Sequence, residues 1–258
     1  MSLPEPTGAE RRRLLGLVAA GLAGLAGCAT HPGASPAVRA SGNVAPFSSA
    51  PAGELPVGWR PYVMRADRAV THYRLVNDGP GQVLYAKAES AGGGLQCHVD
   101  IDPQRQGVLR FSWKVPRAPS EASLAVDEHG DSPARVILGF EGDGARLSVR
   151  ERLFYEQVEL FTGHRLPFAT LMYIWDGQLA PGTVTPDHRS SRIHFLTVES
   201  GAARAGQWLH YRRDVVADFR RVYGEAPGRI SSVGVLTDSD ALKLELEAWY
   251  GDITLLAG

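Results

Sequence analysis

Apolar and polar residues alternate along much of this chain, which is the pattern of β-strands with one buried face. Residues 171–175 are instead apolar on both faces, which predicts a central strand covered on both sides. Short stretches containing glycine and proline separate these segments and predict turns. The strands predicted in this way cover residues 95–101, 109–115, 136–140, 171–175, 191–199, 230–237 and 242–253.

Two segments have helical spacing instead. Between residues 149 and 161, apolar side chains recur at the helical period among arginines and glutamates. Asp214 precedes Val215 and Phe219, and this predicts a short helix that Asp214 caps and that ends near Gly224. Many short strands with two helical insertions predict an all-β fold, an antiparallel β-sandwich or jelly roll.

The N-terminal segment has the composition of a secretory signal. Three arginines at 11–13 precede the uncharged stretch 14–27, which is too short for a bilayer span of about 20 apolar residues. The stretch closes with Leu25-Ala26-Gly27-Cys28, which resembles the lipobox of bacterial lipoproteins, where the signal is cut before a cysteine that carries acyl chains such as palmitate. We therefore expect a signal peptide over 1–27 and lipidation of Cys28.

The alternatives are an ordinary signal peptide with an incidental cysteine, or a buried helix of alanine and leucine. Lipidation would make membrane attachment effectively permanent, because each buried methylene contributes about 0.8 kcal/mol. Ala29 after the cysteine, rather than aspartate, implies the periplasmic side of the outer membrane if the host is Gram-negative. Arg12-Arg13-Leu14-Leu15 also resembles a twin-arginine export signal. We expect the cell envelope as the location, with the membrane as a partner.

Composition limits the remaining chain to one domain on a tether. Residues 28–45 are rich in Ala, Ser, Pro and Gly, which predicts a flexible tether. Residues 46–258 suit one all-β domain that can bury a core of its own. With 27 basic and 28 acidic residues and a net charge of -1, we expect no nucleic-acid partner.

Cys97 has no disulfide partner if Cys28 is lipidated, and its apolar neighbours predict a small buried side chain.

Short motifs follow one another in order from about Phe47 to Ile253. They are Leu55-Pro56-Val57-Gly58-Trp59; Gly94-Leu95 with Ile101-Asp102-Pro103; Leu109-Arg110-Phe111-Ser112-Trp113-Lys114-Val115-Pro116; Asp131 with Ala134-Arg135-Val136; Leu171-Met172-Tyr173-Ile174-Trp175; Arg213-Asp214-Val215 with Asp218; Leu236-Thr237-Asp238-Ser239-Asp240; and Ala248-Trp249-Tyr250-Gly251-Asp252-Ile253. Together they resemble the bacterial family called domain of unknown function 3047. One departure is Ala241-Leu242, where the family usually has an Asn-Thr type pair. The resemblance implies a galactose-binding-like β-sandwich in the envelope, and no established activity.

The sequence carries no recognisable catalytic motif. A Gly-x-Ser-x-Gly elbow, a His-Glu-x-x-His helix, a phosphate loop and a dinucleotide fingerprint are all missing. Asp238, Asp240 and Asp252 could bind a structural calcium ion, since closely spaced carboxylates supply the oxygen ligands it takes. A turn in which aspartate side chains accept backbone N–H groups is the alternative, and the one we prefer. We expect no other cofactor.

Aromatic side chains are better candidates for a ligand site, because sugars present flat C–H faces that pack on aromatic rings. Tyr173 and Trp175 share one face of a predicted strand and precede a turn, and Trp208 is a third candidate. Packing in the core is the alternative that we prefer for Tyr173 and Trp175. Core packing is also our interpretation for Trp113, which shares its face with apolar neighbours.

Two arginines complete the candidate site. Arg135 and Arg213 could clamp an acidic sugar or pair with Asp131 and Asp214, and we prefer the pairing. The sequence thus favours a non-catalytic module that binds a glycan or another envelope ligand. A structural or protein-interaction lipoprotein is one alternative, and it predicts an exposed apolar patch. A carbohydrate-active hydrolase or lyase is another, and a hydrolase needs two carboxylates roughly 5–9.5 Å apart across a cleft.

Overall fold

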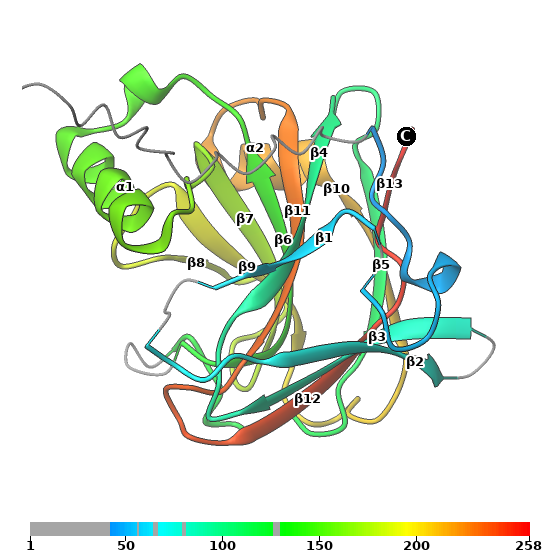
Figure 1. Ribbon diagram of the computed structural model, residues 1–258. Helices are drawn as coiled ribbons and strands as arrows, with labels where there is room; N and C mark the ends of the chain where they lie inside the picture. Colours follow the sequence, from blue (N-terminus) through cyan, green and yellow to red (C-terminus); the bar gives the residue numbers. More distant parts are fainter. Residues whose placement is uncertain (1–41, 56, 64–66, 79–80, 126–129) are drawn as a thin grey trace, which may run out of the picture. The chain divides into compact units, whose positions relative to one another are not determined.

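The computed structural model describes residues 42–258 except 56, 64–66, 79–80 and 126–129, and this part of the chain forms a two-sheet β-sandwich (Figure 1). The predicted signal peptide, the lipidation site Cys28 and most of the predicted tether lie outside the described residues. Among the described residues, no helix is both long enough and apolar enough to span a membrane.

The described residues contain thirteen strands, β1 to β13 in chain order. The first sheet contains β1 (Trp59–Tyr62), β4 (Gly94–Ile101), β6 (Ser132–Phe140), β7 (Ala169–Asp176), β8 (Val184–Pro186), β9 (Ile193–Ser200) and β11 (Ile230–Asp238); the second contains β2 (His72–Asp78), β3 (Gly81–Glu89), β5 (Val108–Lys114), β10 (Leu209–Asp214), β12 (Glu245–Tyr250) and β13 (Thr254–Leu256). The seven-stranded sheet has the order β1-β4-β11-β6-β7-β9-β8, and the six-stranded sheet has the order β10-β5-β12-β3-β2 with β13 beside β5. Neighbouring strands are antiparallel except β7 and β9, which are parallel.

The core lies between the inner faces of the two sheets. Leu138 of β6 and Leu171 of β7 face it from the first sheet, and Trp113 of β5 faces it from the second. The predicted burial of Trp113 and Cys97 is confirmed, because these residues are 0% and 2% exposed. Burial also raises the pKa of the Cys97 thiol, which makes it a poor nucleophile.

The two predicted helices are present as α1 (Val149–Thr162) and α2 (Val215–Tyr223). Ser148 begins α1 with a complete capping box. The side chain of Asp214 caps α2, as predicted, and Gly224 ends that helix in the left-handed conformation at φ 70°. Two short 3-10 helices are η1 (Phe47–Ser49) and η2 (Gly144–Arg146).

The predicted all-β sandwich with two helices is confirmed, while several strands were missed. Strands β1, β8 and β13 are only four, three and three residues long, too short for alternation to be recognised. Strands β2, β3 and β10 were also missed: β2 and β10 each bury a single residue, and β3 buries Ala86 and Ala88 where larger apolar side chains would have marked the alternation. The last predicted strand begins at Glu245 rather than Leu242, because residues 240–243 form a turn. Lys243 in that turn has a φ of 57°, outside the extended region.

Candidate functional site

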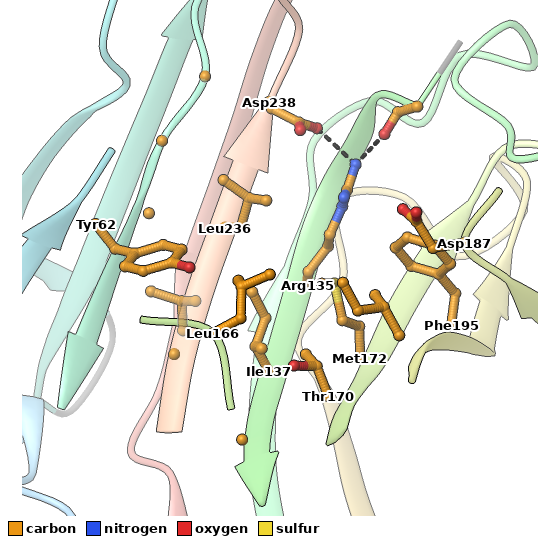
Figure 2. A pocket seen from close by; sticks show the side chains of 18 of the residues that line it. Tyr62, Arg135, Ile137, Leu166, Thr170, Met172, Asp187, Phe195, Leu236 and Asp238 are labelled. Carbon is orange, nitrogen blue, oxygen red and sulfur yellow. Dashed lines mark hydrogen bonds and ion pairs between the residues drawn. The ribbon is translucent and has the colours of Figure 1, made fainter. Parts of the chain in front are cut away.

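A pocket of about 520 Å³ lies over the outer face of the seven-stranded sheet. Its floor consists of residues that alternate with core positions, since successive side chains of a strand point to opposite faces. Ile137 lines the pocket between the core residues Val136 and Leu138, and Met172 lines it next to the core residue Leu171. Figure 2 shows Ile137 and Met172 on the strands that form the floor.

The walls of the pocket come from segments far apart in the sequence. Tyr62 closes one side from the end of β1, the edge strand. Phe154 of α1 packs with Ile174 and Phe195 above β7 and β9. Leu166, from the segment that follows α1, also faces the pocket. Alternation within a strand gives no information about such walls, because they depend on long-range contacts.

Arg135 stands at one end of the floor and is only 5% exposed. Its guanidinium donates to the Asp238 carboxylate at 2.8 Å and to the carbonyl oxygen of Gly130 (Figure 2). The guanidinium also lies 5.7 Å from the ring centroid of Phe195. Its backbone N–H donates to the Tyr250 hydroxyl of the other sheet at 3.3 Å. Both sheets therefore hold Arg135 in place.

Three carboxylates gather beside this arginine. Asp131, Asp238 and Asp240 each have an oxygen within 4.8 Å of the others. Burial raises the pKa of Asp238 to about 6; Arg135 acts in the opposite direction, and the charges of Asp131 and Asp240 add to the increase. Arg135 thus pairs with Asp238 rather than with the predicted partner Asp131. Asp131 instead accepts the backbone N–H groups of residues 241–242, at 3.2 and 2.7 Å.

Of the three predicted calcium ligands, Asp238 and Asp240 lie together, but Asp252 does not join them. Asp252 accepts hydrogen bonds from the backbone N–H and the hydroxyl of Ser48, at 3.0 and 2.5 Å, and is not part of the carboxylate group. At the group itself, Arg135 already places a positive charge beside Asp238. Backbone N–H groups use both oxygens of Asp131. These contacts fit the turn interpretation and leave few free oxygens for a cation.

Two of the predicted aromatic site residues belong to the core. Tyr173 and Trp175 have no exposed surface, so neither ring can contact a ligand: the core packing that we preferred for them is confirmed, and their candidate role as ligand-binding residues was wrong. The Tyr173 hydroxyl donates to Asp218 at 3.1 Å, and the Trp175 indole donates to the carbonyl oxygen of Gly201 at 2.9 Å. The pocket side of β7 is formed by the alternate residues, including Met172.

Trp208 lies outside the pocket and contacts the six-stranded sheet. Its indole N–H donates to Asp78 of β2 at 3.1 Å. The Lys114 ammonium lies 5.5 Å from the Trp208 ring centroid and 4.7 Å from that of Trp249. The structure therefore separates Trp208 from Arg135, and its role in ligand binding stays a prediction.

Arg213 is paired, as preferred from the sequence, but with a different partner. It makes two hydrogen bonds to Asp218, at 2.9 and 2.6 Å, whereas the predicted partner Asp214 caps α2. Arg213 does not line the pocket. An anion clamp formed by Arg135 and Arg213 together is therefore not present in the described part of the chain.

A second charged pair at the pocket was not predicted. Arg189 donates to Asp187 through two nitrogens, at 3.1 and 2.9 Å, in the loop after β8. Burial alone would raise the pKa of Asp187, but the hydrogen bonds and charge of Arg189 lower it. Arg189 also lies 5.8 Å from the ring centroid of Phe154. The Asp-x-Arg spacing in a proline-flanked loop was the only sequence signal for this pair.

Comparison with known structures returns β-rich proteins of low similarity. The K2 cleaved adhesin domain of Lys-gingipain has 10% identity and a TM-score of 0.38, covering 84% of this chain and 98% of that chain. A variant of the family 29 carbohydrate binding module CBM29-2 has 13% identity and a TM-score of 0.35, with 84% and 92% covered. The Trichoderma harzianum endoglucanase 3 from family GH12 has 7% identity and a TM-score of 0.38, with 83% and 95% covered. Likeness at this level carries no argument about activity.

Comparison with sequences is more specific. No curated protein matches the chain. A family model described as "Protein of unknown function (DUF3047)" matches residues 57–254, which include the strands that form the pocket floor and the charged pairs around it. This match agrees with the resemblance seen in the sequence motifs, and the chain belongs to the DUF3047 family.

Proposed function

We propose that this protein is a lipid-anchored component of the bacterial envelope that binds a short glycan in the pocket over its seven-stranded sheet. The lining of the pocket is the observation that carries this proposal. An apolar floor lies between two charged pairs, the buried Arg135–Asp238 and the more exposed Asp187–Arg189. A volume of about 520 Å³ falls within the roughly 300–1,000 Å³ of small-molecule sites.

The chemistry of this lining suits a sugar. Ile137, Met172 and Phe195 offer apolar surface to the C–H face of a sugar ring. The buried Arg135–Asp238 pair holds its donors and acceptors in place before a ligand arrives, which lowers the entropic cost of binding hydroxyl groups. Because each of these charges already has a partner of opposite sign, the pocket favours a neutral ligand over a strongly charged one.

A glycan array followed by titration calorimetry on the detergent-solubilised full chain tests this proposal. Ile137→Trp places a larger ring in the pocket and should weaken binding by at least about tenfold, which corresponds to 1.4 kcal/mol. Trp208→Ala is the matched control near the other sheet and should leave the affinity unchanged. Weaker binding in Trp208→Ala, with unchanged binding in Ile137→Trp, would place the site at Trp208 instead of the pocket. A chain that binds no envelope glycan would contradict the proposal.

The envelope location is part of the same proposal and rests on Cys28. The sequence around it supports lipidation, and Ala29 supports retention at the outer membrane of a Gram-negative host. Mass spectrometry of the mature protein should find an N-terminal Cys28 carrying acyl chains. An intact, unmodified N-terminus would contradict this assignment.

A glycan hydrolase is the second candidate, and Asp238 is the observation that favours it. A carboxyl group with a pKa of about 6 is partly protonated near neutral pH, as a general acid must be. Other carboxylates lie within 4.8 Å, closer than the roughly 5–9.5 Å typical of glycosidases. Release of reducing ends from the bound glycan, abolished in Asp238→Asn while binding persists, would establish hydrolysis.

A further inference from the structure

The outward side of α1 carries large apolar side chains that the sandwich does not cover. Val149, Leu153, Leu160 and Phe161 are 64%, 61%, 80% and 75% exposed. The first three are spaced by four and seven residues, which places them on one side of the helix. Among the described residues, the other large apolar side chains that are exposed are Val57, Val70 and Leu256, which lie far from this segment in the chain.

The helix is therefore apolar on two sides. Its inner side contributes Phe154 to the apolar cluster with Ile174 and Phe195, and its outer side forms the stripe of Val149, Leu153 and Leu160. A helix with apolar residues on opposite sides is usually covered on both. In Figure 1, α1 lies at the margin of the sandwich beside β7 and β8. A second surface is thus expected to cover the outer stripe.

We infer that this stripe rests on the lipid leaflet that holds the Cys28 anchor, an inference that depends on the lipidation proposed above. Arg150 and Arg152 are exposed and follow from the helical period as neighbours of the stripe, one on each side. Neither forms an ion pair with another described residue. Apolar side chains flanked by arginines match a leaflet surface with anionic headgroups.

The acidic residues of the helix limit how it can lie. Glu156 is exposed and, by the helical period, falls within the stripe between Leu153 and Leu160, and Glu159 is exposed one turn further on. The two arginines are in the first half of the helix. Anionic headgroups therefore attract the first turns most strongly. Leu160 and Phe161 are the most exposed apolar residues of the helix, and they add contact with the acyl region at its other end.

The length of chain before the domain allows this contact. Residues 29–41 separate Cys28 from the first described residue, and a chain of that length reaches about 50 Å at most. A folded domain of this size has a radius of gyration of about 17 Å. A tether of that length leaves the domain several orientations at the leaflet, and α1 offers the side with the apolar stripe. Because Phe154 of α1 is a wall of the pocket, the pocket would lie close to the membrane surface.

Spin labelling of the full acylated chain in vesicles of phosphatidylethanolamine and phosphatidylglycerol tests the inference. A nitroxide is attached at Leu160→Cys and, as the matched control, at Arg212→Cys on β10 of the other sheet, where the residue is exposed. Cys97 is buried and free, and acylated Cys28 does not react. Oxygen concentrates in the acyl region of a bilayer, whereas an aqueous nickel chelate stays in water. We expect the nitroxide at position 160 to collide severalfold more often with oxygen than with the chelate, and the nitroxide at position 212 to show the reverse.

The outcomes separate the possible occupants. A label at 160 that is as accessible to the nickel chelate as the label at 212 overturns the inference. A label at 160 that is shielded from both reagents also overturns it, and shows that a protein surface, such as a second copy of this chain, covers the stripe. Leu153→Gln in the labelled chain should lower the ratio of oxygen collisions to chelate collisions at position 160. An unchanged ratio counts against contact of the whole stripe with the leaflet.

Vesicle flotation distinguishes this failure from failure of the proposed function. A chain that does not float with the vesicles has no lipid anchor, which overturns both the envelope assignment and the inference. A chain that floats with an exposed label overturns only the contact of α1 with the leaflet. Glycan titration in detergent, where no leaflet is present, reports on the pocket alone.

Discussion

Replacing Arg135 by leucine removes the positive partner of a buried carboxylate. The side chains of Arg135 and Asp238 are 7% and 16% exposed, and the two charges are 2.8 Å apart. Removing one partner of a buried ion pair typically costs about 3–5 kcal/mol, because the other charge is left without compensation. Asp238 keeps a hydrogen bond from the backbone N–H of Ser132, so we expect the lower value, about 3 kcal/mol, at pH 8.

The loss of stability should depend on pH, and its sign follows from the pKa of Asp238. Folding raises this pKa from 3.8 to about 6, so the folded state binds the proton more tightly than the unfolded state. The carboxyl group therefore makes the protein more stable as the pH falls from about 6 to about 4. Without Arg135 the pKa rises further, and at pH 5 Asp238 is neutral. We expect Arg135→Leu to cost less than about 1.5 kcal/mol at pH 5.

Urea unfolding at pH 8 and pH 5, followed by tryptophan fluorescence, measures both values. The fully buried Trp113 and Trp175 should report the loss of the core. Arg146→Leu is the control, since that side chain is 60% exposed and its ion pair should contribute less than about 1 kcal/mol at either pH. Equal losses for Arg135→Leu at the two pH values, or a loss below 1 kcal/mol at pH 8, would refute the reasoning.

Three further predictions concern other parts of the chain. A Cβ on Gly177 would lie against the backbone carbonyl oxygens of residues 119, 120 and 122, so Gly177→Ala should lower the free energy of unfolding in urea by at least about 2 kcal/mol. Gly81→Ala is the control, because nothing lies within 4 Å of the added carbon, and it should change that free energy by less than about 0.5 kcal/mol. Similar values for the two variants would contradict the close packing around Gly177. Cys97, which is 2% exposed, should react with a thiol reagent only on unfolding, and rapid labelling of the folded chain would contradict its burial in the core. Cys28→Ser should shift the protein from the membrane fraction to the soluble fraction; continued sedimentation with membranes would mean that another feature anchors it.

Local signals in the sequence were sufficient for both α-helices and for seven of the thirteen strands in the described residues. The helix ends could be predicted because their determinants are local: Asp214 caps α2 and Gly224 ends it. Strands with one buried face could be predicted from alternation, as in β4 and β5. Edge strands were missed, as in β1, which is short and contains Pro61, and in β2 and β10, which each bury a single residue. Such strands make few contacts that would leave a pattern in the sequence.

The site was harder to predict, because its geometry depends on residues distant in sequence. All but one of the residues of β7 are buried, so alternation correctly put Tyr173 and Trp175 on one face but could not tell which face points into the core. Arg135 and Asp238 were both named from the sequence, yet their pairing requires β6 and β11 to be neighbours. That adjacency joins residues about a hundred positions apart, and no local pattern encodes it.

Hydrogen–deuterium exchange of the full chain, with and without the tightest-binding glycan of the array, tests the central claim most directly. If the pocket holds the glycan, exchange should slow at the segments that surround it, residues 130–135, 186–189 and 236–241. Slower exchange confined to the neighbourhood of Trp208 and Trp249, or unchanged exchange around the pocket at saturating glycan, would contradict the account.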